Sequence, residues 1–194
     1  VIAFSSRRHI IAAMQEALKI RVGISACLLG EPVRYDGGNR LDPYLAGTLG
    51  EYLECVPVCP EFEAGLGVPR EPMRLAGDPG SPRLVTRDAG VDLTGIIERW
   101  SRAKLRDLAD ADLCGFIFKT RSPSCGVAGV KVFDEKGKAR ASGPGLFARA
   151  FMERFPLVPV EDEERLRDIG IRDSFIVRVF ARFRWKEQVA ADRR

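Results

Sequence analysis

Strand-like and helix-like segments alternate along most of the chain, and this order constrains the fold more than any other feature of the sequence. Apolar, β-rich runs occupy residues 19–27, 55–59, 115–118 and 157–161. Helical patterns separate these runs at residues 41–54, 91–112 and 144–155. Such an alternation is typical of an α/β domain with a mostly parallel sheet flanked by helices. We therefore predict a single α/β domain followed by a C-terminal helical tail.

The remaining segments set the expected domain boundaries. Residues 1–20 are expected to form a leader or a short helix, residues 21–165 the α/β domain, and residues 166–194 an amphipathic C-terminal helix. A stretch rich in Gly and Pro at 64–90 predicts a long loop that contains a hairpin. A second, small hairpin is expected at 129–143.

The tail carries apolar side chains at helical spacing: Phe175, Val179, Phe180 and Phe183. An apolar stripe of this kind is rarely left in water. We expect it to pack on the domain or on a second copy of the chain, so the oligomeric state stays open at this point.

Composition narrows the class of protein. A chain of 194 residues can bury about 70% of its unfolded surface, so it needs no disulfides to fold. Its net charge of +4 is too weak to argue for DNA binding, and no apolar run is long enough to span a membrane. Arg7, Arg8 and Glu16 interrupt the first twenty residues, which argues against a signal peptide. We expect a cytoplasmic protein with reduced cysteines.

Three of the five cysteines lie at or beyond the carboxyl ends of predicted strands: Cys27, Cys59 and Cys125. The carboxyl ends of parallel strands share one edge of a sheet, which is where ligands bind. Proline or glycine lies close to each of the three cysteines in sequence. Such residues fix the backbone, as expected where a side chain must point in a defined direction. Cys55 and Cys114 fall at the opposite strand ends and are expected to be core residues.

The cysteine pattern favours particular metal chemistry. Three soft thiolates without histidine favour an iron–sulfur cluster or zinc. The only histidine, His9, lies in the first twenty residues and is expected to be solvated, which argues against a Cys–His catalytic pair. Three protein ligands leave one metal position open, and an open position can bind a substrate atom.

Three segments that carry these cysteines resemble the signature segments of the thiouracil desulfidase family, iron–sulfur proteins long catalogued as a domain of unknown function. They read VGISACLLGEPVRYDGG, CPEFEAGLGVPREPMRL and FKTRSPSCG, and the similarity runs from about Arg21 to Val160. The resemblance implies a [4Fe–4S] cluster bound by Cys27, Cys59 and Cys125 alone, with the fourth iron open. It also implies a catalytic glutamate and a catalytic serine, at Glu61 and Ser122.

The resemblance further implies non-redox desulfuration of a thiolated pyrimidine, such as thiouracil, to the oxo-pyrimidine and hydrogen sulfide. Without the family resemblance, Glu61 would be interpreted as a solvated loop carboxylate and Ser122 as a turn residue. Three further polar residues of the same segments are expected either to contact substrate or to brace loops: Asp36, Arg70 and Lys119. The tail is similar to the junction that leads, in longer relatives, into a second helical domain.

Two other functions remain open on sequence grounds. The first is a sulfur carrier without a cluster, in which Cys125 forms a persulfide. The second is a protein with a structural zinc whose basic tail binds RNA or another protein. The substrate class also stays open between a free thiopyrimidine base, a nucleoside or nucleotide, and thiolated uridine in tRNA.

Overall fold

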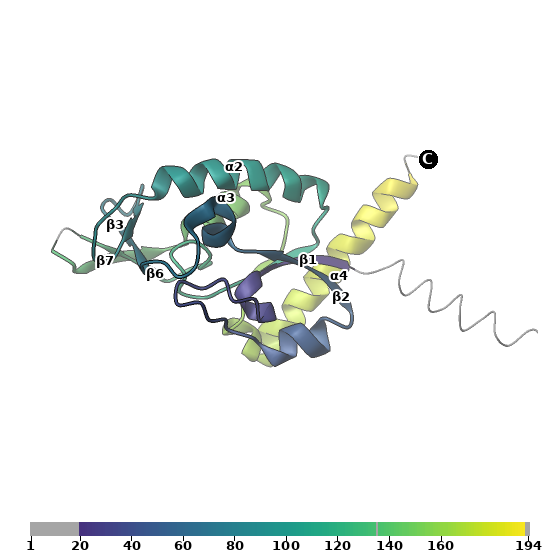
Figure 1. Ribbon diagram of the computed structural model, residues 1–194. Coiled ribbons are helices and arrows are strands. Elements are labelled where there is room, and N and C mark those ends of the chain that lie inside the picture. The colour runs from purple at the N-terminus through teal and green to yellow at the C-terminus, as the bar shows by residue number, and fades with distance from the viewer. Residues whose placement is uncertain (1–19, 135, 193–194) are drawn as a thin grey trace, which may run out of the picture.

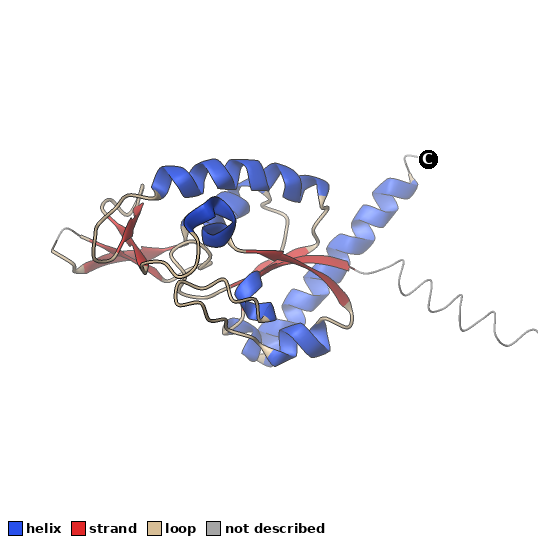
Figure 2. Cartoon of the chain, in the orientation of Figure 1, coloured by secondary structure: helices blue, strands red, loops and turns tan. Residues whose placement is uncertain are grey.

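We describe residues 20–134 and 136–192 of a computed structural model of the chain. The expected leader, with His9, lies almost entirely outside the described residues. The described chain forms two four-stranded sheets, one of them entirely parallel, with helices packed around the parallel sheet (Figures 1 and 2). No helix among the described residues is long and apolar enough to cross a membrane.

The parallel sheet, sheet A, has the strand order β2-β1-β5-β8. Its strands are β1 (Ile20–Ser25), β2 (Leu53–Val58), β5 (Gly115–Phe118) and β8 (Val160–Asp162). Every neighbouring pair is parallel, so the predicted mostly parallel α/β sheet is confirmed. β1 and β5 lie in the middle, and Gly23 lets them pack closely because a Cβ there would come within 2.2 Å of the Phe116 ring.

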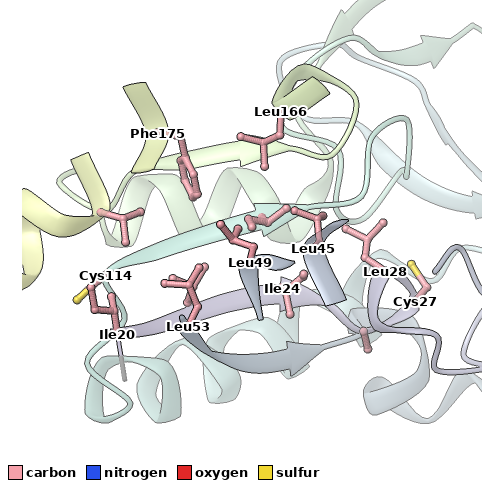
Figure 3. Close-up of a cluster of buried hydrophobic side chains, with 14 of the residues drawn as sticks. Ile20, Ile24, Cys27, Leu28, Leu45, Leu49, Leu53, Cys114, Leu166 and Phe175 are labelled. Carbon is pink, nitrogen blue, oxygen red and sulfur yellow. The ribbon is translucent and has the colours of Figure 1, made fainter. Parts of the chain in front are cut away.

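Helices cover both faces of sheet A. On one face, α2 (Thr94–Asp110) and α3 (Leu146–Arg154) pack against the phenylalanines of β5. On the other face lie the short π-helical segment η2 (Tyr44–Leu49) and α4 (Ile169–Ala191), which form a second apolar core with β1 (Figure 3). The two buried faces explain why the residues of β5 are apolar throughout.

The boundary expected between the helix at 41–54 and the strand at 55–59 was wrong. The helix predicted for residues 41–54 covers only η2, although Asp42 starts it as expected by accepting hydrogen bonds from the N–H groups of Tyr44 and Leu45. It stops early because β2 begins at Leu53, where the strand pairs with Ile20. Burying Leu53 in the sheet outweighs the helical pattern of the residues before it.

The two expected hairpins join into a second sheet, sheet B, with the order β4-β3-β6-β7. Its strands are β3 (Met73–Ala76), β4 (Arg83–Thr86), β6 (Val130–Phe133) and β7 (Ala139–Gly143). The pairs β3–β4 and β6–β7 are antiparallel, as predicted for hairpins. The parallel pair β3–β6 that joins them links segments distant in sequence and was not predicted.

The tail forms the predicted helix, α4, which begins after a short turn, η4 (Arg165–Arg167). Asp168 caps it by accepting a hydrogen bond of 3.0 Å from the N–H of Ile171. Phe175 and Val179 are buried in the core under β1, which shows that the helix packs on the domain. Phe180, which we expected in the same stripe, remains 43% exposed.

Candidate functional site

The loops at the carboxyl edge of sheet A surround one cavity of about 570 Å³. Cys27 lies in the short helical turn η1 (Ala26–Leu29) that follows β1, and Cys59 directly follows β2. Cys125 lies in the loop after β5. All three line the cavity, so the structure brings together the three cysteines that strand order had selected.

Local structure fixes the first two cysteines. The η1 turn ends at Gly30, whose φ of +92° is readily available only to glycine, and the carbonyl of Cys27 accepts a hydrogen bond of 2.8 Å from Arg40. The N–H of Cys59 donates to Oε1 of Glu63 at 2.8 Å. The backbone at Cys27 and at Cys59 is therefore held by hydrogen bonds, which restrict the positions of the two thiols.

Cys125 is held by a turn built from the residues before it. Oγ of Ser122 accepts hydrogen bonds from the N–H groups of Ser124 and Cys125, at 3.2 and 3.0 Å. The N–H of Gly126 donates to the carbonyl of Ser122 at 2.8 Å. Ser122 therefore acts as a turn residue, and it also lines the cavity with its side chain half-buried.

Burial dominates the electrostatics of the three thiols. It raises the pKa of Cys27, raises that of Cys59 to about 11, and raises that of Cys125 well above its usual value. The negative charge of Glu61, and of Cys59 or Cys27 when either is ionised, raises the pKa of Cys125 further, whereas a hydrogen bond with Ser25 lowers it. Without a bound cation the three side chains are therefore thiols at neutral pH, and metal binding must release protons.

Glu61 stands beside the cysteines and is held by two partners. Its Oε2 forms an ion pair of 2.5 Å with Nη2 of Arg70, and their side chains are only 15% and 7% exposed. Its Oε1 accepts a hydrogen bond of 3.1 Å from Oγ of Ser124. Glu61 is thus not the solvated loop carboxylate of the alternative reading. Sequence reasoning missed Ser124, although it lies in the same SPSC segment as Ser122.

The other three polar residues of the signature segments separate into two groups. Arg70 and Lys119 line the cavity, and Nζ of Lys119 pairs with Oε1 of Glu163, a buried residue that sequence reasoning also missed. Asp36 lies on an exposed loop, where it accepts a hydrogen bond from the N–H of Gly38 and contacts Arg34. Asp36 therefore braces a loop.

The remaining cysteines lie away from the cavity. Cys55 is within β2, opposite Val22, and Cys114 directly precedes β5. Cys114 and Cys27 lie at opposite ends of the core between sheet A and α4 (Figure 3). Cys114 is buried, as predicted for a core residue, whereas Cys55 is only half-buried and packs against the same core.

A sequence model of the 2-thiouracil desulfurase family matches residues 22–163 of the chain. The chain belongs to this family. The matched region includes the three cavity cysteines, Glu61 and Ser122, and it nearly coincides with the region in which the sequence resemblance was found.

Two known proteins are similar to this chain, one found by its sequence and one by its fold. YbbK of Bacillus subtilis (strain 168), which carries no functional description, is 28% identical over 151 residues, covering 75% of this chain and 97% of YbbK. The solved structure of the [4Fe-4S]-dependent thiouracil desulfidase TudS is similar with a TM-score of 0.60 and 30% identity. That match covers 80% of this chain and 99% of the TudS chain.

The donor set of the cavity fits the chemistry of an iron–sulfur cluster, because thiolates are its usual ligands. Among residues 20–134 and 136–192, no three His, Cys, Asp or Glu side chains converge closely enough to hold one metal ion. A cubane cluster is larger, because each cysteine binds a different iron at a separate corner, so its ligands need not meet at one point. Three thiols around one cavity of this size fit that requirement.

Proposed function

We propose that this protein removes sulfur from thiolated pyrimidines without net redox change, so that thiouracil and water give uracil and hydrogen sulfide. The observation that carries the proposal is the meeting of Cys27, Cys59, Cys125 and Glu61 around one cavity. Membership of the 2-thiouracil desulfurase family supports the reaction, and similarity to the [4Fe-4S]-dependent TudS supports the cofactor.

In this proposal Cys27, Cys59 and Cys125 hold a [4Fe–4S] cluster. Such a cluster, when bound through three cysteines, supplies an open iron that acts as a Lewis acid toward a soft thiocarbonyl sulfur. The cavity volume of about 570 Å³ is within the usual range of about 300–1,000 Å³ for small-molecule sites. The loops that carry the cysteines thus also form the walls that bind the pyrimidine.

Glu61 acts as the general base. The ion pair with Arg70 and the hydrogen bond from Ser124 hold its carboxylate in a fixed orientation at the cavity, where it can accept a proton from water. The water oxygen then bonds to the ring carbon, its second proton passes to sulfur, the carbon–sulfur bond breaks, and sulfur leaves with its electron pair as hydrosulfide. Glu61 returns the proton, and hydrogen sulfide is released. We assign Ser122, which lines the same cavity, to holding the water.

The experiment that tests the proposal compares three metal states of the purified protein. Portions are reconstituted anaerobically with iron and sulfide, with zinc, or with neither, and each is mixed with 2-thiouracil, 4-thiouracil, 4-thiouridine, its 5′-monophosphate or thiolated tRNA. We expect sulfide and the oxo-product only from the iron–sulfur form. Activity of the metal-free form would favour the persulfide carrier, and zinc retention without activity would favour the structural zinc protein. The most reactive substrate identifies the substrate class.

A further inference from the structure

Ser124 is fully buried, and it is not among the residues that line the cavity. It nevertheless reaches the proposed base, because its Oγ donates a hydrogen bond of 3.1 Å to Oε1 of Glu61. Hydrogen bonds to a charged group are stronger than those between neutral groups. Its hydroxyl therefore has a direct route to the reaction through Glu61.

The second oxygen of Glu61 is held from another segment. Nη2 of Arg70 contacts both Oε2 of Glu61 and, at 3.0 Å, the carbonyl of Val33. Nη1 of Arg70 donates to the carbonyl of Gly67 at 2.8 Å. The guanidinium of Arg70 is therefore fixed by backbone carbonyls. Each oxygen of the Glu61 carboxylate has one hydrogen-bond donor, Ser124 for Oε1 and Arg70 for Oε2.

The backbone of Ser124 is also fixed. Its carbonyl accepts hydrogen bonds from the N–H groups of Phe147 and Ala148 in the first turn of α3, at 3.0 and 3.1 Å. A Cβ on Gly145 would come within 2.6 Å of the carbonyl carbon of Ser124, so α3 and this turn pack closely. Ser124 is thus anchored on a helix that packs against sheet A.

We propose that Ser124 is a positioning residue, which orients the carboxylate of Glu61 from one side while Arg70 holds it from the other. The N–H of Ser124 also donates to Oγ of Ser122, so one residue links both side chains that we assign to the reaction. The inference rests on the proposed function of this site. Its consequence is that losing the Ser124 hydroxyl slows the chemical step and leaves cluster and substrate binding unchanged.

The test uses two variants of nearly equal shape. Ser124→Thr keeps the hydroxyl, whereas Ser124→Val replaces it with a methyl group. In the reconstituted protein we expect Ser124→Val to show a kcat about tenfold or more below that of Ser124→Thr, as for a lost hydrogen bond to a charged group. KM, iron content and the visible absorption of the cluster should be equal in the two variants. Equal kcat values in the two variants would overturn the proposal, and so would a loss of iron confined to Ser124→Val.

A second readout needs no cluster. In the iron-free protein, Ser124→Val should melt about 2–4 °C below Ser124→Thr, because a buried carboxylate oxygen loses its donor. In a Glu61→Ala/Arg70→Met background, which leaves no unpaired buried guanidinium, this gap should disappear. A gap of the same size in that background would show that Glu61 is not the functional partner of Ser124. Failure of the proposed function looks different, because the wild-type cluster form would then release no sulfide at all.

Discussion

The backbone N–H of Lys119 donates a hydrogen bond of 2.9 Å to the hydroxyl of Ser25, which joins the carboxyl ends of the two central strands β1 and β5. Nζ of Lys119 pairs with Oε1 of Glu163, the residue that follows β8. The other oxygen of Glu163 accepts a hydrogen bond of 2.8 Å from the N–H of Thr120. The ends of three strands are thus tied together at the wall of the cavity.

These contacts predict that replacing Glu163 lowers the stability of the fold. Glu163→Ala removes the carboxylate partner of the mostly buried Lys119 ammonium, which keeps only the carbonyl of Thr120 at 3.3 Å, and it leaves the N–H of Thr120 without its acceptor. We expect this change to lower the free energy of unfolding by about 3 kcal/mol. The matched control is Glu164→Ala, because its pair with Arg121 is exposed, with side chains 41% and 78% accessible. That change should cost less than about 1 kcal/mol. Denaturant unfolding measures both, and equal costs would refute the role given to Glu163.

The five cysteines should divide into two classes by iron content. After anaerobic reconstitution we expect about four irons per chain in the wild type, the content of a cubane cluster. Cys27→Ala, Cys59→Ala and Cys125→Ala should each abolish the cluster, since each removes the ligand of one iron. Cys55→Ala and Cys114→Ala should retain it, because neither side chain lines the cavity. The assignment is wrong if either of these two is needed for iron while one of the first three is dispensable.

Glu61 should be needed for catalysis and not for iron binding. Glu61→Ala should keep the full cluster while the rate of sulfide release from 4-thiouracil falls at least about 10²-fold, the low end for a lost acid–base group. Glu61→Gln should be nearly as slow, because the amide keeps the shape but cannot accept the proton. Ser122→Ala should slow the reaction less. Wild-type rates from Glu61→Gln would leave this residue with a structural role only.

The tail helix should contribute to stability through its buried side chains. Phe175 lies in the core with Ile20 and Leu49, so Phe175→Ala should cost about 3–5 kcal/mol of unfolding free energy. Val177 is 67% exposed on the same helix, and Val177→Ala is the control that should change stability little. Deleting residues 173–194 should lower the melting temperature as well. An unchanged melting temperature after the deletion would mean that α4 does not stabilise the domain in solution.

The parallel sheet and the place of the three cysteines were predictable because both depend on local patterns. Each strand of sheet A carries its own apolar run, and the rule for parallel sheets then places the ends of β1, β2 and β5 at one edge. Cys55 and Cys114 were excluded by the same rule. Family resemblance added Glu61 and Ser122, whose residue types alone would not have distinguished them from ordinary loop residues.

What the sequence did not reveal depends on contacts between distant segments. The parallel pair β3–β6 joins two hairpins whose local patterns carry no information about each other. Ser124 and Glu61 are 63 residues apart, and Lys119 and Glu163 are 44 apart, so neither pairing has a spacing rule. Tertiary packing also decided where η2 ends, against the helical pattern of residues 50–54.

The most direct test of the proposed reaction is the fate of water oxygen during turnover. The reconstituted protein is incubated anaerobically with 4-thiouracil in water enriched in ¹⁸O, without any reductant, and uracil and sulfide are quantified with the mass of the uracil. Hydrolytic desulfuration predicts equal amounts of uracil and sulfide, with one ¹⁸O atom in each uracil and no reaction by Cys125→Ala. Unlabelled uracil, or sulfide that appears only when a reductant is added, would contradict it.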